Sequence, residues 1–136
     1  MVREIVRDPM LLAQKSEPAV REDMPVAQDL LDTLKANRER CVGMAANMIG
    51  VRKRIIAVDV NGVCRVMLNP RILAKQGLYA AQKGCLSLDG VRPATRYRTI
   101  ELEFRDGAFI LRRQRFSGFA AQIIQHELDH CDGILI

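Results

Sequence analysis

The two histidines of this 136-residue chain, His126 and His130, lie four positions apart in the segment Gln-His-Glu-Leu-Asp-His near the C-terminus. In a helix this spacing puts both imidazoles on one face, one turn apart, where they can bind the same divalent metal ion. Glu127 is adjacent to that face, so its carboxylate can accept a proton from a water that the metal activates and return it to a leaving group. The pattern requires a helix here and predicts a hydrolytic metal site.

The residues around the motif favour this helix. Ser117 can cap it, residues 118–131 can continue it and Gly133 can end it. A simpler interpretation places the polar residues on the solvated side of a terminal helix. However, Phe119, Ile123 and the two histidines follow one another at steps of four, three and four, so the histidines extend an apolar face. Buried imidazoles need partners, and a metal ion supplies them.

A catalytic metal site needs three protein ligands and an open position for water. The metzincin pattern places the third ligand six residues after the second histidine, where this chain has Ile136, so a compact zinc protease is disfavoured. We expect the third ligand upstream, and a thiolate suits because contact with a metal deprotonates it. Cys85 is the preferred cysteine because Gly84 and Leu86 flank it in an expected strand. The other three cysteines are interpreted as packing residues: Cys41, Cys64 and Cys131.

The rest of the chain alternates helical and strand patterns. An amphipathic helix is predicted over residues 25–41, followed by a loop over 42–50. A hairpin is predicted from strands 54–60 and 63–68 across Asn61-Gly62, with Asn69-Pro70 ending it. Residues 84–88 are expected to be extended, and strands 99–105 and 108–116 form a second hairpin. The expected fold is α+β, with antiparallel sheets packed around the C-terminal helix in a single domain, residues 1–136.

The composition excludes several classes of protein. Hydrophobic residues make up 49% of the chain and charged residues 27%, which is the balance of a globular domain. Residues 1–8 mix charges of both signs and contain no signal-peptide core, so a cytoplasmic location is expected, with no membrane partner. The formal charge of +5 is spread along the chain and aromatic residues are 4%, so no specific nucleic-acid partner is expected. The cysteines form no Cys-x-x-Cys pair and are expected to be reduced thiols.

Three segments resemble the signatures of the peptide deformylase family. These signatures are Gly-x-Gly-x-Ala-Ala-x-Gln, Glu-Gly-Cys-Leu-Ser and Gln-His-Glu-x-Asp-His. Here residues 41–48 are Cys-Val-Gly-Met-Ala-Ala-Asn-Met, residues 83–87 are Lys-Gly-Cys-Leu-Ser and residues 125–130 complete the set. The three occur in the order of the family, and the resemblance covers nearly the whole chain.

The resemblance implies a metal-dependent hydrolase that removes the formyl group from the initiator N-formylmethionine of nascent bacterial polypeptides and releases formate. It implies Cys85, His126 and His130 as ligands of one divalent ion, Fe²⁺ first, with Zn²⁺, Ni²⁺ and Co²⁺ as alternatives that the same ligands suit. Glu127 is then the general acid/base, and the backbone N–H of Leu86 stabilises the oxyanion. The implied substrate-binding residues are Gly43, Met44, Asn47, Met48 and Arg92.

The chain departs from the family pattern at three positions. Met48 replaces the signature glutamine, and a thioether cannot donate the hydrogen bond that the amide gives to the oxyanion. Asn47 is the nearest candidate substitute. Cys41 replaces the first glycine and Lys83 replaces the glutamate before the Gly-Cys-Leu-Ser segment. Neither position is an expected metal ligand, so metal binding should survive.

Two functions are consistent with these residues. The first is a deformylase that acts on N-formylmethionyl peptides. The resemblance is compatible with transient binding to the ribosome but does not require it. The second is a metal-binding relative with weak or no deformylase activity and a binding or regulatory role, suggested by Met48 and Lys83. Glu127 favours the first, because a site that only binds metal needs no base there.

Overall fold

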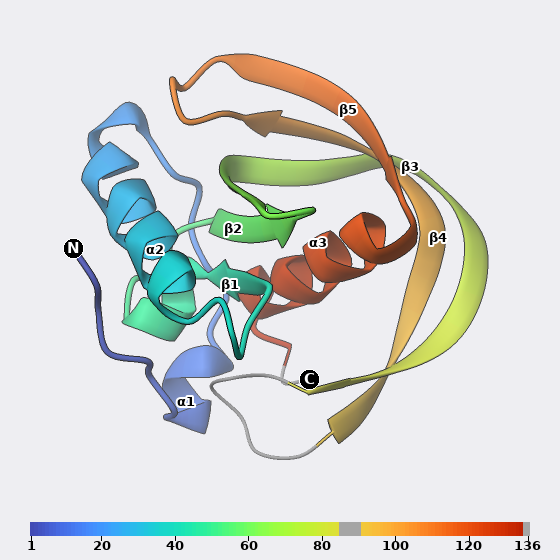
Figure 1. Ribbon diagram of the computed structural model, residues 1–136, viewed down its shortest axis with the longest axis horizontal. Coiled ribbons are helices and arrows are strands. Elements are labelled where there is room, and N and C mark those ends of the chain that lie inside the picture. Colours follow the sequence, from blue (N-terminus) through green and yellow to red (C-terminus); the bar gives the residue numbers. More distant parts are fainter. Residues whose placement is uncertain (85–90, 135–136) are drawn as a thin grey trace.

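A single antiparallel sheet organises the protein (Figure 1). The computed structural model describes residues 1–84 and 91–134, with side chains at residues 1–80 and 95–134. Within these residues five strands lie in chain order across the sheet. They are β1 (Gly43–Ala45), β2 (Ile55–Val60), β3 (Val63–Gly84), β4 (Val91–Arg105) and β5 (Leu111–Ser117). The α+β prediction is therefore confirmed, and among the described strands β1 lies at one edge and pairs with β2.

The first predicted hairpin is confirmed at β2 and the start of β3. Asn61 and Gly62 both have positive φ, 54° and 82°, as a two-residue type I′ connection requires. The prediction that Asn69-Pro70 ends the second strand is wrong, because β3 continues to Gly84. The register shifts between Leu68 and Arg71, so the intervening Asn69 and Pro70 form an irregularity in the strand. The missing N–H of the proline is tolerated at such a point. The amide of Asn69 fixes this point by bonding the backbone N and O of Ala19 at 2.7 and 2.8 Å.

The second hairpin is also confirmed, with longer strands than predicted. β4 begins at Val91 rather than residue 99, because its first half pairs with the unforeseen extension of β3. β5 pairs with β4 from Arg105↔Leu111 to Thr99↔Ser117. Asp106 closes the connection by accepting hydrogen bonds at Oδ1 from the backbone N–H groups of Ala108 and Ile110. The β3–β4 hairpin curves around the C-terminal helix (Figure 1).

The first long helix, α2 (Met24–Ala36), is shorter than the predicted 25–41. Cys41 continues the heptad step from Leu34, but the intervening residues 38–40 are exposed and polar. The side chain of Asn37, the C-cap residue, donates to the carbonyl of Thr33 at 2.8 Å and ends the helix. The prediction of a loop over 42–50 is also wrong, since this segment forms β1 and the 3₁₀ helix η2 (Ala46–Ile49).

Alternation along β2 divides the core into two layers. Ile55 and Ala57 face one layer, and Ile56 and Val58 face the other, as the two-residue period of a strand requires. The first layer lies against α2 and includes Leu30, Leu34, Met44, Met48 and Leu68. The second lies against the C-terminal helix and includes Ile100, Leu102, Phe104, Ile124 and Leu128. Both faces of β2 are therefore buried, and this strand contributes side chains to both core layers.

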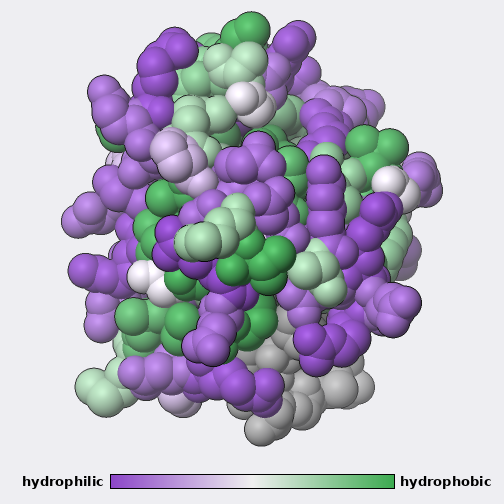
Figure 2. Space-filling view, turned by 60° about the vertical axis from the view of Figure 1, so that its left-hand side comes forward, coloured by the Kyte–Doolittle hydropathy of each residue, from purple (hydrophilic) through white to green (hydrophobic). Residues whose placement is uncertain are grey.

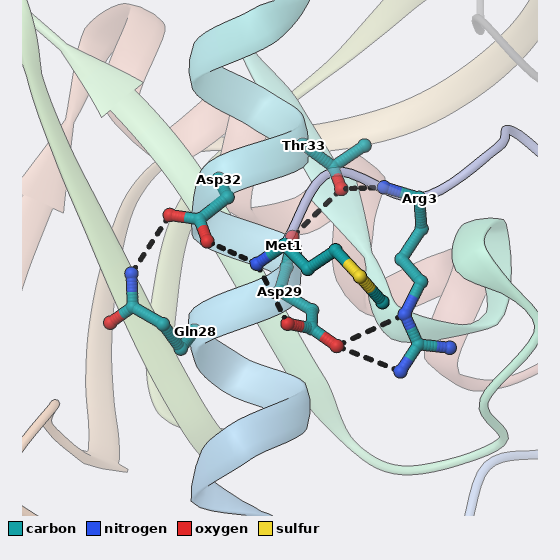
Figure 3. Close-up of polar contacts among 6 residues, drawn as sticks. All are labelled: Met1, Arg3, Gln28, Asp29, Asp32 and Thr33. Atoms are coloured by element: carbon teal, nitrogen blue, oxygen red, sulfur yellow. Dashed lines mark hydrogen bonds and ion pairs between the residues drawn. The ribbon is translucent and has the colours of Figure 1, made fainter.

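The N-terminal segment runs along α2 (Figure 3). The ammonium group of Met1 bonds Asp29 at 2.9 Å and also contacts Asp32, while two N–H groups of Arg3 donate to Asp29 at 3.0 and 2.7 Å. The pKa of Asp29 is held below its usual value, mainly by its hydrogen bond to the terminal ammonium. The short helices α1 (Pro9–Leu12) and η1 (Arg21–Asp23) follow. Leu12 joins the first core layer, which fixes the segment to the rest of the fold.

The face that carries this segment is mainly hydrophilic, with small apolar patches between the charged side chains (Figure 2). None of the helices in the described ranges has the length and hydrophobicity of a membrane-spanning segment.

Candidate metal centre

The helix that carries the histidine pair, α3 (Gly118–Cys131), has the predicted bounds. Ser117 is the N-cap residue, although its side chain makes no capping hydrogen bond. Gly133 ends the helix with φ of 74°, and its N–H bonds the carbonyl of His130 at 3.1 Å. The N–H of Ile134 bonds the carbonyl of Asp129 at 2.9 Å, which completes a Schellman motif. A Cβ at position 133 would lie 2.5 Å from the carbonyl oxygen of Ala13, so glycine is required there.

The two imidazoles converge as the spacing predicts. Nε2 of His126 lies 3.1 Å from Nε2 of His130. Two nitrogens bound to one tetrahedral metal at 2.0–2.1 Å lie about 3.3 Å apart, so this separation fits a shared ion. His126, Glu127 and His130 are all buried and form a group whose ligand atoms lie within 4.8 Å of one another. The described part of the chain therefore holds a set of donors that can bind a divalent metal ion.

The apolar face of α3 is shorter than predicted. Ile123, His126 and His130 are buried, but Phe119 is 58% exposed, so its assignment to the buried stripe is wrong. The reason is the position of β1, whose backbone meets α3 at Ile123 and Glu127, one and two turns after Phe119.

Gly43 allows β1 to approach α3 this closely. A Cβ built at Gly43 would lie 2.6 Å from Cγ2 of Ile123 and 2.8 Å from Oε2 of Glu127. No side chain larger than hydrogen fits without moving the helix or the carboxylate. The contact places the backbone of an edge strand directly beside the Glu127 side chain.

Burial sets the protonation of the centre. The pKa of Glu127 is raised to about 8, chiefly by desolvation, with the charge of Arg96 acting in the opposite direction. Its Oε1 has no hydrogen-bond partner among the residues that the structure describes. Burial lowers the pKa of His130 to about 4, so this imidazole is neutral at pH 7, as a metal ligand must be. A buried carboxyl beside the neutral imidazole of His130 is an environment that suits a divalent cation.

Two residues, Arg96 and Gln125, hold α3 against β4. The sequence patterns assign no role to either of them. Arg96 is 2% exposed and bonds Oδ2 of Asp129 at 2.8 Å. Gln125 accepts a hydrogen bond from the backbone N–H of Tyr97 and donates one to its backbone O, both at 2.7 Å. Gln125 belongs to the third family signature, but no sequence pattern assigns a role to Arg96.

Met48 replaces the family glutamine, and Asn47 is the candidate substitute for it. The side chains of these two residues contact different parts of the fold. Nδ2 of Asn47 donates to the carbonyl of His130 at 2.9 Å, and Asn47 is fully buried. Met48 lies in the core layer beside α2, and its Sδ accepts from the N–H of Ala45 at 3.4 Å. Met44 is buried in the same layer. The proposed substitution of Asn47 for the glutamine stays a prediction.

Three expected site residues are not tested by these contacts. Cys85 and Leu86 lie outside the described residues, and at Arg92 the structure describes the backbone, which pairs with Lys83. The remaining cysteines fit a packing role. Cys41 and Cys64 are half-buried, and burial raises the pKa of the Cys131 thiol to about 12, which leaves it protonated and inert.

Comparison with known proteins agrees with this geometry. Over 136 residues the chain is 52% identical to a peptide deformylase from Clostridium beijerinckii, with 100% of both chains covered. A solved peptide deformylase from Legionella pneumophila superposes with a TM-score of 0.88 at 28% identity, covering 99% of this chain and 83% of that one. A class I type b enzyme from Acinetobacter baumannii, solved with Met-Ala-Ser bound, has the same fold, with a TM-score of 0.87 at 24% identity and 99% and 97% coverage. Residues 2–136 also match the polypeptide deformylase profile. The chain belongs to the polypeptide deformylase family.

Proposed function

We propose that this metal-dependent hydrolase removes the formyl group from the N-formylmethionine of nascent peptides with one divalent ion held by Cys85, His126 and His130. The observation that carries the proposal is the convergence of two buried imidazoles, 3.1 Å apart at Nε2, beside the buried carboxyl of Glu127. A metal bound there supplies a Lewis acid that polarises the formyl oxygen and acidifies water.

Glu127 is the general acid/base in this proposal. With its pKa raised to about 8 the side chain is mostly protonated at pH 7 in the metal-free protein, and the charge of a bound divalent cation would favour the carboxylate. That carboxylate takes a proton from the attacking water and returns it to the departing amine of the methionine. Gly43 lets the β1 backbone pack against Glu127, which limits the movement of the carboxylate. Glu127 is 3% exposed, so little bulk water can compete for the proton that it carries.

The edge of β1 is the proposed site for the peptide main chain. β1 pairs with β2 on one side, and an extended peptide can add to the other side by backbone hydrogen bonds. Gly43 and Met44 contribute backbone groups, since the side chain of Met44 is buried in the core. Asn47, Met48 and Arg92 stay in the proposed substrate-binding set, with the Leu86 N–H at the oxyanion. The Met-Ala-Ser bound to the Acinetobacter enzyme is a peptide of the expected chemical class.

The finer assignments are also proposals. Fe²⁺ is the preferred ion, because one thiolate and two imidazoles suit it as well as Zn²⁺, Ni²⁺ or Co²⁺. The ribosome is a proposed transient partner because the substrate is a nascent peptide. The proposed location is the bacterial cytoplasm, where such peptides are made.

Cys85→Ser tests the ligand set, with Cys64→Ser as a matched control on β3. We expect the Cys85 variant to lose both its metal, measured per chain after gel filtration, and formate release from formyl-Met-Ala-Ser. The control should keep both. Normal metal content in Cys85→Ser would remove Cys85 from the ligand set, and normal formate release without metal would contradict the proposed chemistry.

A further inference from the structure

Strand β4 changes its partner beside the metal centre. Its pairing with β5 ends at Thr99↔Ser117, where the chain turns into α3. Two residues earlier, the N–H and C=O of Tyr97 both bond the side-chain amide of Gln125 on α3 at 2.7 Å. The amide also donates to the carbonyl of Ala121 at 2.9 Å, which fixes its orientation. Gln125 thus takes the place of a neighbouring strand at this point of the ladder.

A second contact joins the same two elements. Nη1 of Arg96 donates to Oδ2 of Asp129 at 2.8 Å and to the carbonyl of Thr95 at 2.9 Å. Nε and Nη2 of Arg96 are buried and have no acceptor among the described residues. A buried guanidinium with unused donors is costly to stability, so packing alone does not explain an arginine at this position. We call Gln125, Arg96 and Asp129 the helix–strand clamp.

The clamp acts within one residue of each histidine. Gln125 immediately precedes His126, and Asp129 immediately precedes His130. On the other side, β4 belongs to the hairpin whose strands end at Gly84 and Val91, and Cys85 follows directly on Gly84 in the chain. The clamp therefore connects the helix that carries two proposed ligands to the hairpin that leads to the third.

We propose that the helix–strand clamp is a positioning device that sets the histidine pair relative to the β3–β4 hairpin and so determines the affinity of the metal centre. The inference rests on the proposed function, because it takes the ligand set from there. Partners that orient metal ligands commonly contribute about 10-fold to 100-fold in metal affinity.

The test compares Gln125→Met with Arg54→Met. The first removes the amide that bonds Tyr97 and keeps the length of the side chain. The second is a matched control, because Arg54 bonds Asp132 at the end of the same helix at 2.7 Å but is not part of the clamp. Co²⁺ affinity is measured by competition with a chelator, and the visible spectrum of the Co²⁺ protein reports coordination geometry. Hydrogen exchange at the Tyr97 amide of the metal-free protein reports the clamp itself.

We expect Gln125→Met to weaken Co²⁺ binding by about 10-fold or more, to alter the Co²⁺ spectrum and to expose the Tyr97 amide to exchange. Arg54→Met should keep wild-type affinity and spectrum, because its ion pair with Asp132 lies outside the clamp. Arg96→Met should behave like the Gln125 variant, with partial rescue in Arg96→Lys, which retains a charge for Asp129. Should the Arg96 variants fail to fold, the Gln125 variant still decides the matter.

Equal Co²⁺ affinity in Gln125→Met and Arg54→Met would overturn the inference, as would unchanged protection of the Tyr97 amide. Failure of the proposed function has a different signature, since wild-type protein would then bind no Co²⁺ or release no formate. A wild-type enzyme that binds metal and turns over, with indifferent clamp variants, would leave the proposed function standing and remove only the positioning role.

Discussion

At the scale of single residues, the contact between Gly43 and Glu127 links packing to chemistry. We predict that Gly43→Ala lowers the free energy of unfolding by about 1–3 kcal/mol, because the added Cβ overlaps atoms of Ile123 and Glu127. We also predict a lower kcat, since the carboxylate must move to make room. Urea unfolding and formate release measure the two effects.

Gly107→Ala is the control for this substitution. A Cβ at Gly107 meets Cγ2 of Val66 at 3.6 Å, which is an ordinary contact, so stability and kcat should stay close to wild type. If Gly43→Ala behaves like Gly107→Ala, the close packing of β1 on α3 is not what holds Glu127.

The histidine pair shows what the sequence can predict at this scale. A spacing of four in a helix is local geometry, so the convergence of His126 and His130 followed from the sequence. Arg96 and Gln125 could not be assigned in the same way, because their contacts depend on how far the β3–β4 hairpin curves over α3. The predicted burial of Phe119 was wrong for a related reason, since residue spacing along α3 does not reveal how far β1 covers the helix.

At the scale of elements, the connection between β4 and β5 depends on one carboxylate. Asp106 accepts from Nε of Arg112 and from the backbone N–H groups of Ile110 and Ala108. These hydrogen bonds, that of Arg112 first, lower the pKa of Asp106 from 3.8 to about 2. Because the folded-state pKa lies below the unfolded one, the stabilisation is complete above pH 4 and is lost as the pH falls through about 2.

We therefore predict that Asp106→Asn lowers the urea midpoint most above pH 4 and that its difference from wild type shrinks toward pH 2. Unfolding curves measured at several pH values for both proteins test this. Glu22→Gln, at an exposed position of η1, is the control and should show little difference at any pH. A difference between Asp106→Asn and wild type that does not change with pH would contradict the assignment.

Some boundaries of the helices and strands depend on the local sequence, and others depend on contacts between residues far apart in the chain. The Asn-Gly connection of β2 and β3 was predictable because its positive φ values are a property of those two residues. The continuation of β3 past Asn69-Pro70 was not, because the irregularity there is held by hydrogen bonds to Ala19, 50 residues away in the sequence. The sequence did not predict the end of α2 at Ala36, because the spacing of apolar residues continues to Cys41 although the helix does not.

At the scale of the whole molecule, the proposed ligands come from α3 and from the residue that follows β3 in the chain, so metal binding and folding should be coupled. A ligand present at 100 times its dissociation constant stabilises the folded state by about 2.7 kcal/mol. We predict a gain of this size when Co²⁺ is added to chelator-treated protein, measured by urea unfolding. His126→Ala should show little gain, and a wild-type protein equally stable with and without Co²⁺ would argue against an ion bound only by the folded chain.

The central claim is that Glu127 performs acid/base chemistry at a metal centre for deformylation. The most direct measurement is formate release from formyl-Met-Ala-Ser by wild type and Glu127→Gln, each prepared anaerobically with iron and with metal content determined on the same samples. We predict that wild type turns over and that Glu127→Gln retains its metal while its kcat falls by about 10²–10⁴-fold. Comparable turnover in the two proteins, or no formate from a metal-loaded wild type, would contradict this claim.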